Sequence, residues 1–231
     1  MSVTLQKTID WASPIIRFLP LNIGANSEPA ITNANIVQQT IMGPPFCWDW
    51  NRSSLTFNTV ADQQDYVQLV NDFGFIEKAT VSFNGEVKEI TVRDSLSLDS
   101  RVGRPEYISS QIDNNAGNIT FRLMKKPDVI YSVNVIYQKK ASLFTALSDT
   151  WSIPDKYSYI YNYGFLTLAM LHLDDPRIAY YNQKFMSALL GTNHGLTEMQ
   201  RNIFVGNWLA LTGQESAYSI RTQQAQIARG T

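Results

Sequence analysis

The sequence has few of the residues on which enzyme and metal chemistry most often depends. Among its 231 residues there are one cysteine, Cys47, and two histidines, His172 and His194. A single cysteine excludes an internal disulfide, and its apolar surroundings in PPFCWDW favour a buried structural thiol. The chain also lacks the H-E-x-x-H, G-x-S-x-G, Walker and dinucleotide-binding glycine patterns. We therefore expect no catalytic residue, no metal site and no cofactor, and we interpret both histidines as structural.

Two acidic segments resemble metal sites only superficially. Asp174 and Asp175 are adjacent carboxylates, but they precede Pro176, as residues at the start of a helix do. The segment DNNAGN, residues 113–118, begins like a calcium loop and lacks the distal glutamate. We predict a helix start for the first and a β-turn for the second.

Charge is also scarce, and long apolar runs are absent. Charged residues make up 17% of the chain, and the formal net charge is -1. This balance argues against a protein that binds nucleic acid through a basic face. No apolar run reaches membrane-spanning length, and the N-terminus lacks the apolar core of a signal peptide. We expect a soluble protein made and used in a cytoplasm.

The hydrophobic period changes twice along the chain. Helical spacing with start and stop signals dominates both ends, whereas alternation typical of strands dominates the middle. We predict an α+β fold in which a helical bundle built from both ends of the chain carries an inserted antiparallel β domain. The expected parts are an N-terminal helical part (1–53), the β domain (54–142), the C-terminal helices (143–213) and an extended docking tail (214–231).

Two hairpins are expected in the β domain. The first lies in KATVSFNGEVKEITV, where Asn84 and Gly85 form the strongest local turn signal of the chain. The second is expected in residues 118–138, where two alternating runs flank a turn near Pro127 and Asp128.

The segment DKYSYIYNYGF, residues 155–165, places a tyrosine at every second position, which resembles a strand. Its flanks favour a helix instead, because Ser152 can cap it and Pro154 fits its first turn. We predict a helix over residues 154–173. Its apolar residues recur at spacings of three and four, namely at Tyr157, Ile160, Tyr161, Gly164, Phe165, Leu168 and Leu171.

A second aromatic stripe lies beside this face, at Tyr159 and Tyr163. A helix with two such stripes has more than one neighbour, and tyrosine suits a partly wet contact. Gly164 would let a neighbouring backbone come close. We predict that Tyr159 and Tyr163 face a neighbouring subunit while Tyr157 and Tyr161 face the core; ordinary intradomain packing of all four is the alternative.

The order of these features resembles that of the adaptor, or head-to-tail connector, proteins of tailed bacteriophages, and of the tail tubular protein A group in particular. The resemblance spans about residues 44–190. It rests on five segments taken in order: PPFCWDWNR, FNTVADQQDYVQLVNDFGFIEKATVSFNG, VGRPEYIS, NITFRLMKKPDVIYSVNVIYQKKAS and LSDTWSIPDKYSYIYNYGFLTLAMLHLDDPRIAYYNQKFMSALL. It implies a structural virion protein, not an enzyme. It further implies a dodecameric ring beneath the portal, with an axial channel through which DNA passes without specific binding.

The resemblance also implies the partners and the place of assembly. These are the portal protein, the next tail component (a nozzle or tail tube) and further copies of the chain, in the neck or tail of a virion assembled in the host cytoplasm, without a membrane. The polar tail 214–231 spaces its apolar residues too thinly to bury a face alone, and the resemblance makes the portal its target. Its expected portal-binding residues are Tyr218, Ile220, Arg221, Ile227 and Arg229.

Arg101 and Arg104 lie at the loop VGRPEY and are candidates for ion pairs between subunits, with a solvated loop as the alternative.

Two other functions remain open from the residues alone. One is a neck or baseplate subunit elsewhere in the tail, and the other is a carbohydrate-binding or depolymerising tail component.

Overall fold

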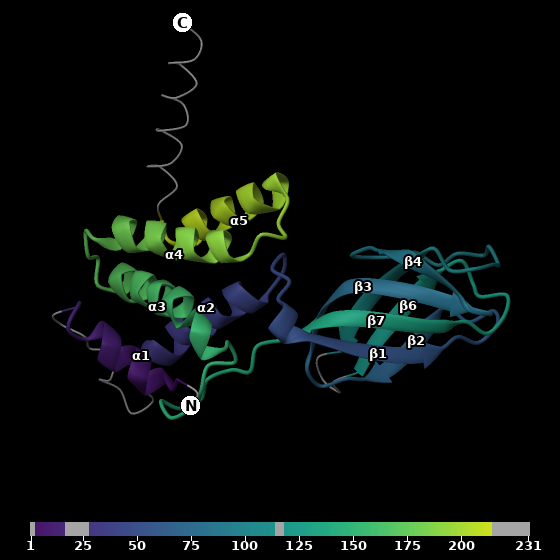
Figure 1. Ribbon diagram of the computed structural model, residues 1–231, viewed down its shortest axis with the longest axis horizontal. Coiled ribbons are helices and arrows are strands. Elements are labelled where there is room, and N and C mark those ends of the chain that lie inside the picture. Colours follow the sequence, from purple (N-terminus) through teal and green to yellow (C-terminus); the bar gives the residue numbers. More distant parts are fainter. Residues whose placement is uncertain (1–2, 17–27, 114–117, 214–231) are drawn as a thin grey trace, which may run out of the picture. The chain divides into compact units, whose positions relative to one another are not determined.

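The chain folds into two compact units. The computed structural model describes residues 3–16, 28–113 and 118–213. One unit, called here the helical unit, comprises Met1–Ile41 with Ser142–Thr231, and the other, the β unit, comprises Met42–Ala141. Figure 1 shows the helices and strands of both units.

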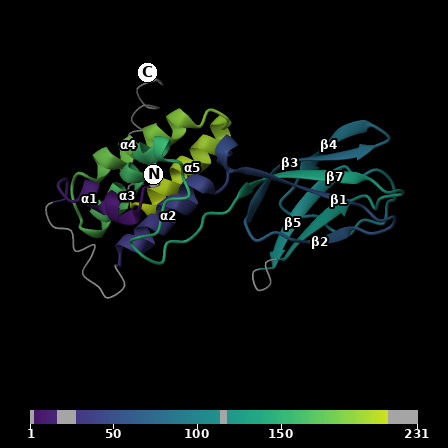
Figure 2. The ribbon, with the colours of Figure 1, turned by 60° about the horizontal axis from the view of Figure 1, so that its bottom comes forward.

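The helical unit is organised around its most apolar helix, α3. Helix α3 lies between α1 and α4 (Figures 1 and 2). Val37 of α2 also reaches α3, and α5 packs on α4 through the rings of Phe185 and Trp208, whose centroids lie 4.6 Å apart. The helices are α1 (Leu5–Ala12), α2 (Ala30–Met42), α3 (Ser158–His172), α4 (Ile178–Thr192) and α5 (Glu198–Leu211), with a 3-10 turn, η3 (Asp155–Tyr157), before α3.

Helix starts were predicted with mixed success. The spacing Thr-x-x-Gln at Thr197 and Gln200 predicts a capping box, and this box is present at the start of α5. The cap expected at Ser152 is wrong, because the tyrosine helix begins with the 3-10 turn η3 and its N-cap is Tyr157, without a side-chain cap. The Ser152 N–H donates instead to the side chain of Gln38 on α2 at 2.7 Å. The buried side-chain amide of Gln38 therefore binds Ser152, the residue that local capping rules assigned to the start of the helix.

Gly164 lets α2 and α4 approach α3. A Cβ at this position would lie 2.8 Å from Cγ1 of Val37 and 2.9 Å from Cε2 of Phe185. The expected close approach is therefore real, although side chains rather than a neighbouring backbone occupy the space. Close packing of this kind leaves no room for an added methyl group.

The β unit is a curled seven-stranded sheet with the strand order β1-β7-β3-β4-β5-β6-β2. Although β1 and β2 are its two edges, the ring centroids of Phe57 on β1 and Tyr66 on β2 lie 5.2 Å apart, so the sheet rolls up around its core. The elements are η2 (Asp49–Asn51), β1 (Arg52–Asn58), β2 (Asp65–Leu69), β3 (Phe73–Phe83), β4 (Glu86–Val92), β5 (Tyr107–Asp113), β6 (Asn118–Met124) and β7 (Ser132–Lys139).

The expected fold class is wrong. The β domain is not antiparallel throughout, because β4 and β5 run parallel and pair at Thr91 with Tyr107 and at Val92 with Ile108. Nor do the helices form one regular bundle from both ends of the chain, since α1, α2 and α4 contact α3 while α5 packs on α4. The fold is a mixed α+β arrangement of a seven-stranded curled sheet and five helices within the described ranges. Hydrophobic periodicity identifies strands but carries no information on their direction.

The two expected hairpins have opposite outcomes. The Asn84-Gly85 turn joins β3 to β4, with both residues at positive φ (49° and 84°), as a two-residue hairpin turn requires. The hairpin expected over residues 118–138 is wrong, because β6 pairs with β5 and β2 whereas β7 pairs with β1 and β3. The chain crosses the rolled sheet between them instead of turning back. Residues 114–117 of the expected β-turn lie outside the described residues.

The core of the β unit consists of the inward-facing residues of every strand. It is rich in aromatic rings, and Phe57 and Phe73 both pack on Phe121 at 5.7 Å between centroids. Such rings bury large apolar areas and stabilise a small unit efficiently. The buried set is Phe57, Tyr66, Phe73, Ile76, Ala79, Val81, Ile90, Ile108, Ile119, Phe121, Leu123, Tyr131, Val133, Val135 and Tyr137.

Candidate assembly surfaces

The two tyrosines expected at a subunit interface lie four residues apart on α3. Tyr159 is 42% exposed, and its hydroxyl shares a hydrogen bond of 2.7 Å with the hydroxyl of Thr192 at the end of α4. Tyr163 is half-buried and makes an edge-to-face contact with Trp11 of α1, with ring centroids 6.1 Å apart. Tyr163 is thus partly used within the subunit, and Tyr159 carries most of the surface that a neighbour could cover.

The other tyrosine stripe contributes to the core. Tyr161 is fully buried, and burial, together with the charge of Asp155, raises the pKa of its hydroxyl to about 12. Tyr157 is half-buried. Of the four tyrosines, Tyr159 is exposed and Tyr161 is fully buried, whereas Tyr157 and Tyr163 are both half-buried.

Arg101 is paired within its own subunit. It lies in the 14-residue connection between β4 and β5, residues 93–106, which we call the strap. Its guanidinium and its N–H both bind the carboxylate of Asp99, with a guanidinium contact of 2.9 Å. These hydrogen bonds hold the pKa of Asp99 at about 2, well below its ordinary value.

Arg104 is tied to the β3–β4 hairpin. It pairs with Glu86 at 2.9 Å and donates to the carbonyl of Val81 at 3.3 Å. The sequence analysis named no partner for either arginine. The Asp-x-Arg spacing is a local signal from which the pairing of Arg101 with Asp99 could have been predicted. Glu86 lies 18 residues from Arg104, and no sequence signal connects them.

The remaining predicted residues divide by whether the structure describes them. Tyr218, Ile220, Arg221, Ile227 and Arg229 lie outside the described residues.

Cys47 is half-buried, and its burial, with the nearby charge of Glu77, raises the pKa of its thiol to about 11. Asp175 accepts hydrogen bonds from the N–H and guanidinium of Arg177 just before α4, and these lower the pKa of its carboxyl to about 2.

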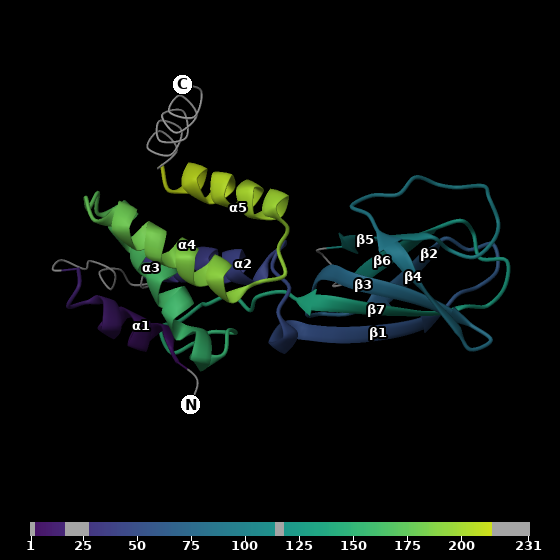
Figure 3. The same cartoon turned by 45° about the horizontal axis from the view of Figure 1, so that its top comes forward.

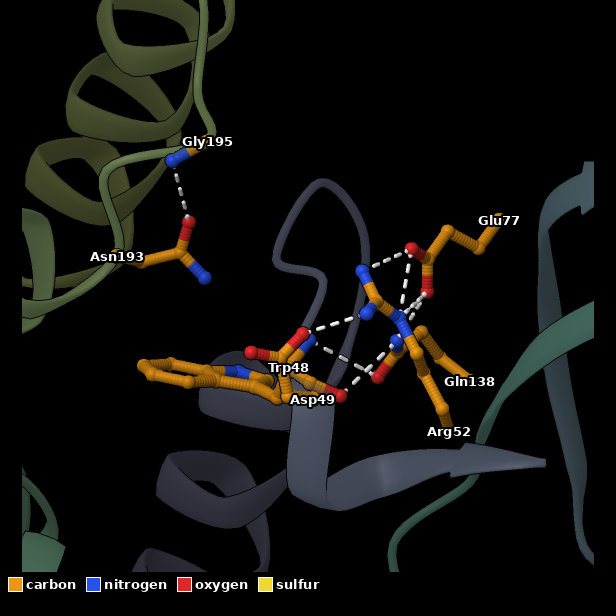
Figure 4. A network of polar contacts seen from close by, with 7 residues as sticks. All are labelled: Trp48, Asp49, Arg52, Glu77, Gln138, Asn193 and Gly195. Carbon is orange, nitrogen blue, oxygen red and sulfur yellow. Dashed lines mark hydrogen bonds and ion pairs between the residues drawn. The ribbon is translucent and has the colours of Figure 1, made fainter.

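A polar network at the start of β1 was not predicted. The buried side chain of Gln138 accepts from the N–H of Trp48 at 3.1 Å and donates to the Trp48 carbonyl at 3.2 Å (Figure 4). The same amide donates to Glu77 at 2.6 Å, and Glu77 also accepts two hydrogen bonds of 2.8 Å from Arg52. Although partial burial opposes it, the hydrogen bonds from Arg52 and Gln138 lower the pKa of Glu77.

A second unpredicted network joins the two chain segments of the helical unit. Asn35 on α2 donates to the carbonyl of Phe144 at 3.1 Å and accepts from its N–H at 2.7 Å. The fully buried Gln38 binds both Ser142 and Ser152. These amides replace the backbone partners that an irregular segment lacks, so the returning chain can be buried.

Polar side chains of the described ranges thus serve mainly as internal ties. No three His, Cys, Asp or Glu side chains in these ranges gather as a metal site would require. In the same ranges, no helix has both the length and the apolar character needed to span a bilayer. Among the predicted residues that the structure describes, Tyr159 is partly exposed, and Arg101 and Arg104 are paired within the chain.

Comparison with known families identifies the class of protein. The model of the SU10 adaptor protein family matches residues 5–203. The chain belongs to this family, as the resemblance to bacteriophage head-to-tail adaptors predicted. As a phage adaptor it is a structural virion component that interacts with other head or tail components. No curated protein matches the chain.

Proposed function

We propose that the protein forms an adaptor ring that joins the portal to the tail and leaves an axial channel for DNA. The observation that carries this proposal is the family match over residues 5–203, which spans the β unit and most of the helical unit. In this proposal the ring is dodecameric, lies in the neck or tail of the virion and is assembled in the host cytoplasm.

A ring requires a heterologous contact that closes by rotation, so each subunit presents two different faces to its neighbours. The partly exposed Tyr159 supports such a face on α3, because its ring offers apolar area and its hydroxyl already has an internal partner. Arg101 and Arg104 support it less, since each is paired within the subunit. They would join neighbours only through further hydrogen bonds or by exchanging partners.

The partners in this proposal are the portal above and a nozzle or tail tube below. The C-terminal segment 214–231 is the proposed portal contact, with Tyr218, Ile220, Arg221, Ile227 and Arg229 as its binding residues. A formal charge of -1 suits a channel that DNA passes without being held, because tight binding to phosphates requires many cationic contacts.

Mixing the purified chain with the portal of the same phage tests the proposal. We expect negative-stain images to show rings of the chain bound coaxially to the portal. A chain truncated after Gly213 should remain folded by circular dichroism and lose portal binding. Unchanged binding by the truncated chain would show that residues 214–231 do not contact the portal. Rings that never bind the portal would favour a neck or baseplate position.

A further inference from the structure

Strand β4 has an open edge inside the sheet. It pairs with β3 along Ala79–Phe83, but it meets β5 only at Thr91 and Val92. The strap residues just before β5 run along the end of β6 and do not pair with β4 ahead of Thr91. There the Glu106 N–H donates to the carbonyl of Met124, and the Gly103 N–H donates to that of Lys126. Figure 3 shows this long connection as an open loop beside the strands.

Main-chain groups of β4 face the space that the strap leaves. The Thr91 N–H donates to the Glu106 carbonyl at 2.9 Å, so the main chain of Thr91 points toward β5. Alternate residues of a strand direct their main-chain groups to the same side. The N–H and carbonyl groups of Val87 and Glu89 therefore point toward the same side as those of Thr91, where the register gives them no β5 partner.

The space beside this edge is a polar hollow of about 450 Å³. Most of its charges are compensated: Arg104 pairs with Glu86, Lys125 with Glu106, and Glu89 with Lys78. Lys88 is the exception, because it is exposed and has no ion pair among the described residues. The lining residues are Lys88, Glu89, Thr91, Arg104, Pro105, Glu106, Tyr107 and Lys125.

We propose that this edge is a docking site for an extended, acidic segment of another virion protein, which adds to β4 as an extra strand. Val87 and Glu89 supply the main-chain hydrogen bonds that hold such a strand. Lys88, on the same face of β4 as Ile90, supplies the charge that selects a carboxylate. Val87 is 65% exposed on the opposite face of β4, and it supplies an apolar contact for the side chain of the docked segment that lies beside it on that face.

The charge of Lys88 also argues against a second copy of β4 as the occupant. A charged side chain on an open edge is a common protection against pairing between identical edges. Two β4 edges placed side by side would bring two uncompensated Lys88 ammonium groups together, which costs free energy. The same charge stabilises an acidic strand, so the edge distinguishes a foreign segment from its own copy.

Two synthetic hexapeptides test the site on the full chain. One has the sequence Thr-Val-Glu-Val-Thr-Val, and the other carries Lys in place of Glu. We expect the Glu peptide to shift the amide resonances of Val87 and Glu89 and to bind about tenfold more tightly than the Lys peptide, or about 1.4 kcal/mol. In Lys88→Glu the preference should reverse, since the edge then selects a cation.

The variant Lys7→Glu, which makes the same charge change at an exposed position of α1, is the matched control. It should leave the preference for the Glu peptide unchanged. The proposal is overturned if neither peptide shifts Val87 and Glu89, if Lys88→Glu keeps the original preference, or if Lys7→Glu alters it equally. The peptide experiment does not require the proposed ring, so portal-bound rings together with inert peptides would reject this site alone.

Discussion

The indole of Trp151 lies flat on the ring of Tyr161, with centroids 4.3 Å apart and planes inclined by 10°. The same indole donates its Nε1–H to the hydroxyl of Thr8 on α1 at 2.9 Å. This stack therefore joins α1, the segment that returns from the β unit, and α3. A helix that looks like a tyrosine-rich surface in the sequence is anchored by one of its tyrosines.

Truncation of this tyrosine should destabilise the helical unit strongly. We expect Tyr161→Ala to lower the free energy of unfolding by about 3 kcal/mol or more, because it removes a fully buried ring. Tyr159→Ala should cost about 1 kcal/mol or less in the isolated subunit. Urea denaturation followed by fluorescence measures both, and equal losses would show that Tyr159 is a core residue too.

Gly164→Ala should destabilise the protein although alanine favours helices. The added Cβ would lie within 2.9 Å of Val37 and Phe185, and overpacking of this kind costs about 1–3 kcal/mol. The matched control is Gly206→Ala on α5, where nothing lies within 4 Å of the new Cβ. There we expect a gain of about 0.5–1 kcal/mol from helix propensity alone. Opposite shifts of the urea midpoint confirm the prediction, and two stabilised variants would contradict it.

Gln138→Ala should destabilise the β unit by about 3 kcal/mol. The change removes the two hydrogen bonds to the main chain of Trp48 and the one to Glu77, all of them at a buried position. Gln111→Ala on β5 is the control, because that side chain is exposed, and we expect a change within about 0.5 kcal/mol. Similar unfolding midpoints for the two variants would count against the network.

The thiol of Cys47 should react slowly in the folded chain. Its pKa of about 11 leaves far less thiolate at pH 8 than an ordinary cysteine with a pKa of about 8.5 has. Because the thiolate is the nucleophile, alkylation by iodoacetamide should be at least about a hundredfold slower than in urea. Mass spectrometry follows the reaction directly, since the chain has no other cysteine. Equal rates in both states would refute a structural thiol.

The Asp99–Arg101 pair should lose its contribution to stability only in strong acid. The pKa of Asp99 is lowered to about 2 in the folded chain from an ordinary value of 3.8. A depressed carboxyl pKa stabilises the folded state above the ordinary value, and this stabilisation disappears as the pH falls through about 2. In Arg101→Gln, which keeps the main-chain N–H contact, the carboxyl resonance of Asp99 should titrate at a higher pH than in the unaltered protein. The same midpoint in both proteins would exclude the pair as the cause.

Local signals in the sequence predicted local structure well. The Asn84-Gly85 hairpin and the Thr197 capping box each depend on residues within four positions of one another, and both are present. The helix predicted over residues 154–173 was also confirmed over Ser158–His172, which follows the 3-10 turn Asp155–Tyr157. In these cases the chemistry that decides the structure lies within a single window of sequence.

The same rules did not predict contacts between residues that lie far apart in the sequence. The parallel pairing of β4 with β5 depends on the path of the strap, and alternation alone does not reveal it. The ties made by Gln38 and Gln138 join residues 104 and 90 positions away, where no spacing pattern operates. For the candidate surfaces, the subunit contact at Tyr159 and Tyr163 stays a prediction, and the internal partner of Arg104 has no signal in the sequence.

The chain enters and leaves the β unit at adjacent points, because Arg52 at the start of β1 pairs in register with Gln138 near the end of β7. A segment whose two ends lie one strand spacing apart can be replaced by a tight turn or by a different segment with similarly spaced ends. Evolution can therefore exchange or resize residues 42–141 in one recombination event while the helical unit retains its own core. Such modular replacement would change the surface of the β unit and keep that of the helical unit.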